Sequence, residues 1–180
     1  MAEARAERDA AAAPLPTGSQ ERIDQMTALL RSAAPSISFE ASANATGEVI
    51  ATVDPAAVLV LCQAAKSNPE LAFDHLRFIS GIDQMDDGIE IVYSLWSYTK
   101  RRSLFIKTLL APAALRVESV AGVWSAADWH ERETAEMFGV IFEGHPEMKH
   151  LLLDDDMQIH PLLKAHPLAP IEIKQGVNAF

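Results

Sequence analysis

The chain has 180 residues, of which 49% are hydrophobic, and this length suits one domain with a substantial buried core. Its formal net charge of -10 argues against nucleic acid as a partner, because phosphate binding depends largely on Lys and Arg. No run of about twenty apolar residues occurs, so the sequence predicts no membrane-spanning helix.

The predicted elements follow an alanine-rich N-terminal leader, residues 1–18. The leader carries acidic side chains and lacks the apolar block of a secretory signal, so it is predicted to be disordered. A first helix is predicted over 20–33, where apolar side chains recur at helical spacing between Ile23 and Leu30. Pro35 is expected to end this helix.

Two strands and a second helix are predicted next. The strands cover 37–41 and 48–53 and are expected to pair around a turn at 44–47. Asp54 and Pro55 then mark a helix start, with a capping carboxylate and a proline at the first helical position.

The single cysteine, Cys62, falls within this second helix. One cysteine excludes an internal disulfide, and it excludes an iron–sulfur cluster held by several cysteines of this chain. If the protein is part of a redox enzyme complex, this chain is therefore predicted not to carry the electrons.

Three strands are predicted to complete the domain. Residues 90–98 and 103–110 are rich in side chains that favour strands, whereas 73–80 is ambiguous by pattern alone. Turns at 86–88 and 100–102 join the three segments. The basic turn at 100–102 is interpreted as a solvated hairpin tip, with a docking contact as the alternative. The elements together predict a two-layer α+β domain with the order helix, two strands, helix, three strands.

A further helix is predicted over 126–138. Ser125 and Asp128 resemble a capping box with a shorter acid, and Gly139 is expected to stop the helix. This helix completes the domain that is predicted for residues 19–138.

Two carboxylates share the apolar face of this helix. At about 100° per residue, Trp129, Glu133 and Met137 form one stripe, and Glu136 flanks it. Arg132 lies four residues before Glu136 and can pair with it within the helix.

Three interpretations of the acidic side chains stay open. The acids are solvated on an exposed helix, they form a general acid–base pair, or they are desolvated against basic groups of another chain. The neighbouring Glu131 is expected to point away from the stripe.

Residues 139–180 are predicted to form an extended C-terminal arm. Its density of prolines excludes one long helix or a central strand, and its apolar content is too high for a free tail. The arm is therefore predicted to pack on a partner subunit, and the alternative is that it folds back on its own domain. The four prolines are Pro146, Pro161, Pro167 and Pro170.

The arm also concentrates histidines. Three of the four precede a proline, which favours extended backbone, so the histidines are interpreted as making backbone hydrogen bonds. Metal binding is the alternative. The residues concerned are His145, His150, His160 and His166, together with Asp154, Asp155 and Asp156.

The run from Trp129 to Leu153, WHERETAEMFGVIFEGHPEMKHLLL, resembles the signature of the 30 kDa-type subunit of respiratory complex I. Similar strings extend the resemblance from about Phe73 to Leu168: FDHLRFISGIDQ at 73–84, GIEIVYSLWSY at 88–98 and AADWHERE at 126–133. HPLLKAHPL at 160–168 stands where the family usually has Gly-His-Pro-Leu-Arg-Lys-Asp-aromatic-Pro-Leu. It departs from that pattern at Ile159, Leu163, Ala165 and His166.

The resemblance implies a non-catalytic peripheral-arm subunit of a proton-translocating NADH:quinone oxidoreductase. It further implies that the chain braces the large 49 kDa-type quinone-site subunit and the iron–sulfur subunits. No cofactor is expected in this chain, since FMN, the iron–sulfur clusters and quinone would belong to the partners. The implied location is peripheral, on the cytoplasmic face of the bacterial inner membrane, or on the matrix face if the protein is mitochondrial.

The same resemblance implies contact positions rather than catalytic or metal-binding residues. An equivalent subunit of a membrane-bound nickel–iron hydrogenase or formate hydrogenlyase complex is the alternative, followed by a free-standing metal-dependent enzyme that uses the arm. The expected contact residues are Glu131, Arg132, Glu133, Glu136, His145, Pro146, Lys149, His160, Pro161 and Lys164.

Overall fold

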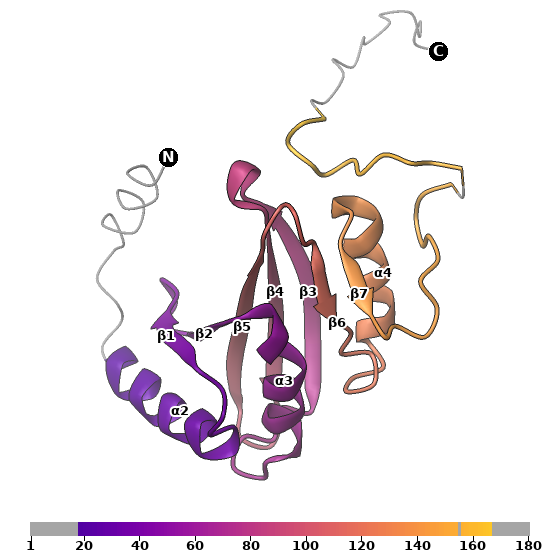
Figure 1. Cartoon of the computed structure of the whole chain (residues 1–180). Helices are drawn as coiled ribbons and strands as arrows, with labels where there is room; N and C mark the ends of the chain where they lie inside the picture. The colour runs from indigo at the N-terminus through magenta and orange to yellow at the C-terminus, as the bar shows by residue number, and fades with distance from the viewer. Residues whose placement is uncertain (1–17, 155, 167–180) are drawn as a thin grey trace, which may run out of the picture.

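A five-stranded sheet with the order β1-β2-β5-β4-β3 forms the centre of the structure (Figure 1). This computed structural model describes residues 18–154 and 156–166, so the predicted leader up to residue 17 and the arm beyond 166 lie outside the described residues. The elements are α2 (Ser19–Ala33), β1 (Phe39–Ala43), β2 (Val49–Val53), the 3-10 turn η1 (Pro55–Ala57), α3 (Val58–Ser67), β3 (His75–Asp83), η2 (Met85–Asp87), β4 (Ile89–Ser97), β5 (Arg102–Leu110), β6 (Arg116–Glu118), α4 (Ala127–Phe138) and β7 (Ile141–Glu143).

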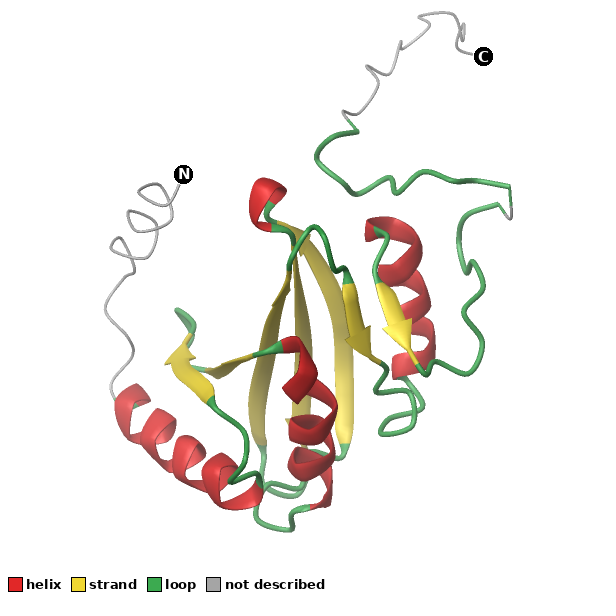
Figure 2. Ribbon diagram, viewed as in Figure 1, coloured by secondary structure: helices red, strands yellow, loops and turns green. Residues whose placement is uncertain are grey.

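The helices pack against one face of this sheet. α2 contacts the edge strands β1 and β2, and α4 contacts the opposite edge strand β3. α3 lies between them and follows β2 in the connection to β3, at the far edge of the sheet. β5 pairs with β2 in parallel, whereas the other neighbouring strands of this sheet are antiparallel. Figure 2 shows this layer of helices beside the sheet and the loop that continues from β7.

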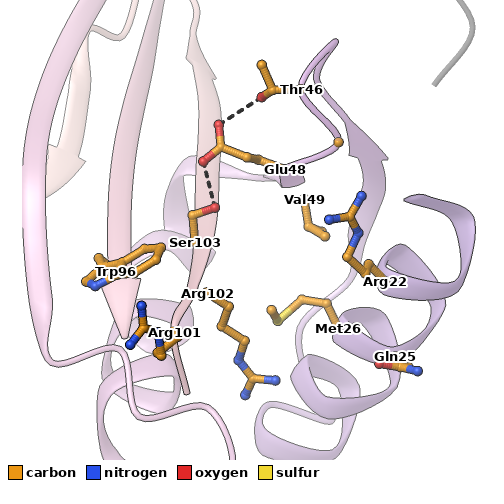
Figure 3. Close-up of a pocket in the computed structure, with 11 residues that line it drawn as sticks. Arg22, Gln25, Met26, Thr46, Glu48, Val49, Trp96, Arg101, Arg102 and Ser103 are labelled. Atoms are coloured by element: carbon orange, nitrogen blue, oxygen red, sulfur yellow. Dashed lines mark hydrogen bonds between the residues drawn. The ribbon is translucent and has the colours of Figure 1, made fainter. Parts of the chain in front are cut away.

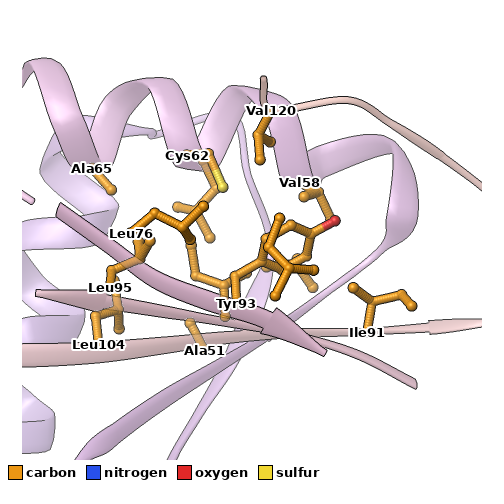
Figure 4. Packing of buried hydrophobic residues seen from close by; sticks show 14 of the residues in the cluster. Ala51, Val58, Cys62, Ala65, Leu76, Ile91, Tyr93, Leu95, Leu104 and Val120 are labelled. Carbon is orange, nitrogen blue, oxygen red and sulfur yellow. The ribbon is translucent and has the colours of Figure 1, made fainter. Parts of the chain in front are cut away.

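The core lies between α3 and the middle of the sheet (Figure 4). Val58, Leu61 and Cys62 of α3 are completely buried, as are Tyr93 and Leu104 on the strands below them. Burial raises the pKa of the Cys62 thiol, with the nearby Glu131 carboxylate adding to the shift, so the thiol stays protonated. Cys62 therefore behaves as a small apolar core residue.

The predicted α+β fold and its order of elements are confirmed. The ambiguous segment at 73–80 is the edge strand β3, and its pairing with β4 supplies the backbone partners that the pattern alone does not reveal. The predicted helix start at Asp54 is also confirmed, since its carboxylate accepts a hydrogen bond of 3.0 Å from the Ala56 N–H.

The first hairpin differs from the prediction by two residues. β1 covers Phe39–Ala43 instead of 37–41, because the turn fixes which residues face β2. The Asn44 side chain accepts hydrogen bonds from the N–H groups of Thr46 and Glu48, and Gly47 adopts a φ of 78°. The pairing therefore runs outward from this turn.

Candidate subunit interface

α4 ends as the sequence predicts but begins differently. Gly139 has a φ of 76°, and its N–H donates to Ala135 O at 2.8 Å, so the predicted C-terminal stop is confirmed. The predicted capping box is wrong. The N-cap is Ala126 in a helical conformation, and Ser125 only accepts a main-chain hydrogen bond from Asp128.

Glu131 is completely buried, contrary to the expectation that it points away from the packed face. Its carboxylate accepts a hydrogen bond of 2.6 Å from the Ser119 hydroxyl and one of 2.7 Å from the Val120 N–H. α4 turns this carboxylate inward, whereas Trp129 is 65% exposed and Glu133 is exposed. The helix therefore buries a different stripe from the predicted one, because the loop before it supplies partners for a carboxylate.

The Glu131 carboxyl predicts a pH-dependent stability. Burial raises its pKa from 4.5 to about 7, although the hydrogen bonds from Ser119 and Val120 oppose the shift. Since the folded-state pKa is the higher one, the carboxyl favours folding most below about pH 4.5, and that contribution is lost as pH rises through about 7. The expected loss between these limits is about 3 kcal/mol.

Urea unfolding of the full chain and of Glu131→Gln at pH 5 and pH 8 measures this loss. The amide cannot ionise, so subtracting the variant's pH dependence isolates the Glu131 contribution from that of other groups. Equal pH dependence in both proteins would contradict the assigned shift.

Glu136 and Arg132 together hold the main chain of the arm, and we name this pair the α4 clamp. The Glu136 carboxylate accepts hydrogen bonds from the N–H groups of Leu151, Leu152 and Leu153 at 3.0, 3.1 and 3.3 Å. The Arg132 guanidinium donates to the carbonyl groups of Lys149 and His150, both at 2.9 Å. The side chains therefore bind residues 149–153 instead of forming the predicted intrahelical pair.

Further contacts hold the arm between the clamp and residue 166. The His160 ring donates from Nδ1 to Glu136 O at 2.8 Å, and Leu162 N–H donates to Met137 O at 3.2 Å. Lys164 N–H donates to the Asp83 carboxylate at 2.7 Å. Over its described residues, the arm therefore folds back on its own domain, which was the alternative interpretation.

The predicted boundary at residue 139 does not separate the domain from the arm. The arm begins with β7, which pairs in parallel with β6 in a small second sheet. Prolines did not prevent this strand, because all four lie after it. Both strands have three residues, which is too short for alternation to predict them.

The rings of three of the four histidines in the arm, those of His145, His150 and His160, make backbone hydrogen bonds, as predicted. His145 donates from Nε2 to Asp128 O at 3.1 Å, since its Nδ1 accepts from the Glu147 N–H, and His150 bonds to Asp154 O at 3.0 Å. Over residues 18–154 and 156–166, no group of three or more His, Cys, Asp or Glu side chains has an arrangement suited to a metal ion.

The predicted contact residues occupy three kinds of position. Glu131 and Glu136 are buried inside the domain, which departs from the predicted contact with another chain. For the exposed and half-buried residues, contact with a partner stays a prediction. Glu133, Pro146, Lys149 and Lys164 are exposed, whereas Arg132, His145, His160 and Pro161 are half-buried.

Sequence reasoning missed two residues that hold these segments, Asp83 and Ser119. Asp83 is part of the FDHLRFISGIDQ string, which resembles the family sequence. The resemblance does not reveal that its carboxylate binds the Lys164 N–H. Ser119 stands in an irregular loop, and no pattern in the sequence distinguishes it.

Large apolar side chains point outward from α4 and the arm. Of the eleven that are exposed among the described residues, six lie between positions 129 and 162. Trp129 and Leu152 are the most exposed of these, at 65% and 64%. The six residues are Trp129, Ile141, Met148, Leu152, Ile159 and Leu162, and we refer to them as the outer apolar residues. Their number in one part of the chain marks it as a candidate interface.

No helix within the described residues combines the length and apolar character needed to cross a bilayer. The chain matches the model of the family described as "Respiratory-chain NADH dehydrogenase, 30 Kd subunit" over residues 51–172.

Named relatives agree with this match. The C subunit of an NADH-quinone oxidoreductase from Roseiflexus sp. (strain RS-1) is 35% identical over 160 residues, which cover 87% of this chain and 91% of that protein. The corresponding protein of Salinispora tropica is 35% identical over 71% of this chain but only 54% of its own length. The chain thus spans about half the length of some relatives.

Two solved structures share the fold. One is a trypsin-resistant fragment of Nqo5, with a TM-score of 0.52 and 21% identity over 70% of this chain and 98% of that one. The other belongs to a membrane-bound sulfane sulfur reductase, an archaeal respiratory membrane complex, with a TM-score of 0.68 and 22% identity over 81% of this chain and 85% of that one. The family match, the relatives and the shared fold lead to one conclusion: the chain belongs to the family of the 30 kDa subunit of respiratory-chain NADH dehydrogenase.

Proposed function

We propose that the chain is a peripheral-arm subunit of a proton-translocating NADH:quinone oxidoreductase, and that it braces other subunits without an active site of its own. The family match and the names of its relatives support membership of such a complex. The observation that carries the bracing role is the surface formed by α4 and the arm, where the outer apolar residues lie.

The α4 clamp prepares this surface for binding. The side chains of Arg132 and Glu136 hydrogen-bond to five main-chain atoms of residues 149–153, so part of the arm is ordered before a partner binds. A surface that is already ordered loses less conformational entropy on association. The arm thus presents Leu152 outward from a rigid base.

The partners that fit this role are the 49 kDa-type quinone-site subunit and the iron–sulfur subunits. On this proposal, FMN, the iron–sulfur clusters and quinone are held by those partners and not by this chain. The location that follows is peripheral to the membrane, on the cytoplasmic face in a bacterium or the matrix face in a mitochondrion.

The interface is tested by placing charge on it. The double substitution Trp129→Glu and Leu152→Glu is expected to leave the isolated chain folded, because both side chains are exposed. Recovery of the variant in the assembled complex should fall by at least about tenfold, since buried apolar anchors often contribute 2 kcal/mol or more to an interface. Affinity purification of the complex from native membranes, followed by quantification of this chain, measures the effect.

The matched control is Val60→Glu, which adds one negative charge at an exposed apolar position of α3. This variant should assemble like the wild type. Wild-type recovery of the double variant, with full quinone reductase activity, would remove the interface role from α4 and the arm.

A subunit of a second kind of assembly has the same fold. The likeness to a subunit of a membrane-bound sulfane sulfur reductase favours an equivalent bracing subunit in a related membrane-bound complex, such as a nickel–iron hydrogenase or formate hydrogenlyase, as the second candidate. The proteins that co-purify with the chain decide between them, because only the first assembly contains the NADH-oxidising subunits.

A further inference from the structure

A recess of about 250 Å³ lies far from α4, between the N-terminal half of α2, the turn that joins β1 to β2, and the turn before β5 (Figure 3). Arg22 enters its lining from α2, and Arg101 and Arg102 enter from the turn and the start of β5. Nothing in the proposed bracing role uses this recess. We refer to these three residues as the arginine cluster.

The arginine cluster is unusual in a chain with a net charge of -10. Among the described residues, no carboxylate lies within salt-bridge distance of Arg22, Arg101 or Arg102. The only side-chain hydrogen bond of Arg22 to a described residue goes to the Ser19 hydroxyl, at 3.3 Å, and Arg102 donates from Nη2 to the main-chain oxygen of Glu70. Within the part of the chain that the structure describes, no ion pair therefore neutralises the cluster.

Arg102 has a buried donor without an acceptor. Its Nε is buried and has no hydrogen-bond partner among residues 18–154 and 156–166. Burial also lowers the pKa of this guanidinium from its usual value, although Glu70 opposes the shift. A buried N–H group that lacks an acceptor is costly, and an anion placed beside Nε would supply one.

One carboxylate, Glu48, also lines the recess, but its oxygens are occupied. It accepts hydrogen bonds from Ser103 at 2.7 Å, Asn44 at 3.0 Å and Thr46 at 3.1 Å, and Arg77 lies 3.7 Å away. These contacts hold the carboxylate at the rim, where Figure 3 shows it joined to Thr46 and Ser103. Three arginines against one glutamate leave the lining with a formal charge of two positive units.

The remaining walls are partly apolar. The Trp96 indole and the Met26 thioether face the recess from β4 and α2. Arg77 stacks on the Trp96 ring at 4.5 Å from its centroid, which fixes the orientation of the indole. The volume lies just below that of most ligand sites, which commonly measure about 300–1,000 Å³, so the recess suits a compact molecule and not a folded segment.

We propose that the recess binds a small phosphate-bearing molecule, with its phosphate against the arginine cluster and its organic part against Trp96 and Met26. The planar guanidinium group matches phosphate oxygens through paired N–H donors. A phosphate monoester carries about two negative charges near neutral pH, which complements the charge of the lining.

Titration calorimetry of the full chain with inorganic phosphate and with glycerol phosphate tests the site, with chloride at matched ionic strength as the blank. Saturable binding of both is expected, and it should be weaker by at least about tenfold in Arg22→Gln/Arg101→Gln, because two charge-assisted contacts are lost. Arg31→Gln is the matched control. It removes one charge from an exposed position of α2 outside the recess, and it should bind like the wild type.

Amide chemical shifts of the wild-type chain keep the test valid if the double variant does not fold. Phosphate should move the signals of Gly47 and Ser103, which line the recess. Shifts confined to other regions, binding equal to that of chloride, or equal affinity in the folded double variant would each overturn the proposal. Binding to vesicles with anionic lipid but to neither soluble phosphate would also overturn it, because the cluster would then serve a membrane surface.

Discussion

Glu136→Ala is expected to free residues 149–153 from α4 while the five-stranded sheet stays folded. The carboxylate accepts from three main-chain N–H groups and is almost completely buried, with 4% exposure. Hydrogen bonds to a charged group contribute roughly 1.5–3 kcal/mol each, and water replaces part of this once the arm opens. A net loss of about 3 kcal/mol raises the population of the open arm by about 100-fold.

Hydrogen exchange at the amides of residues 151–153 measures this opening directly. Glu133→Ala is the control, because it removes the same charge from an exposed position on the same helix. Its exchange should match the wild type within about twofold. Wild-type protection of these amides in Glu136→Ala would show that the clamp does not hold the arm.

Gly139→Ala is expected to lower the free energy of unfolding by about 3 kcal/mol, through two separate effects. The first is the φ of 76°, since a left-handed conformation costs an alanine roughly 1–2 kcal/mol. The second is a collision, because an added Cβ would lie 2.8 Å from both Cδ2 and Nε2 of the His160 ring. Urea unfolding followed by circular dichroism gives the total.

The two effects can be separated within this chain. Gly144 has a φ of 79° with no atom within 4 Å of an added Cβ, so Gly144→Ala reports the backbone cost alone, roughly 1–2 kcal/mol. In a His160→Ala background, Gly139→Ala should cost no more than that. If Gly139→Ala and Gly144→Ala are equally destabilising in the wild type, the close packing of His160 on the end of α4 is wrong.

The regular part of the fold is predictable from the sequence because local chemistry determines it. Asp54 caps the turn that leads into α3, Asn44 and Gly47 form the first hairpin turn, and Gly139 ends α4. Each of these residues acts on atoms within a few positions of itself. For that reason the order of elements and most of their boundaries follow from the pattern.

The packed face of α4 was not predictable in this way. Periodicity groups Trp129 with Glu133 and Met137, but it does not state which side of a helix meets the rest of the protein. Burial of Glu131 depends on the hydroxyl of Ser119 and the N–H of Val120, in an irregular loop. From sequence alone a carboxylate is predicted to be exposed, because the donors that allow its burial are known only from the structure.

The attachment of the arm was hidden for a related reason. Glu136 and Arg132 are among the predicted contact residues, yet their partners are main-chain groups of residues 149–153. Every amino acid provides such a carbonyl group, and every one except proline provides the N–H. The apolar content of the arm therefore predicts that it packs on a surface, but it does not identify that surface as α4 of the same chain. The short strands β6 and β7 were missed because their pairing joins segments that lie far apart in the sequence.

The α4 clamp binds peptide groups, so its hydrogen bonds do not depend on which side chains follow position 149. Any residue that keeps its amide hydrogen can replace Leu152, whose side chain points to solvent, and the anchoring geometry survives. Divergence at the exterior of the arm is thereby uncoupled from its attachment. A lineage can adapt this exterior to a new neighbouring subunit without redesigning the helix that carries it.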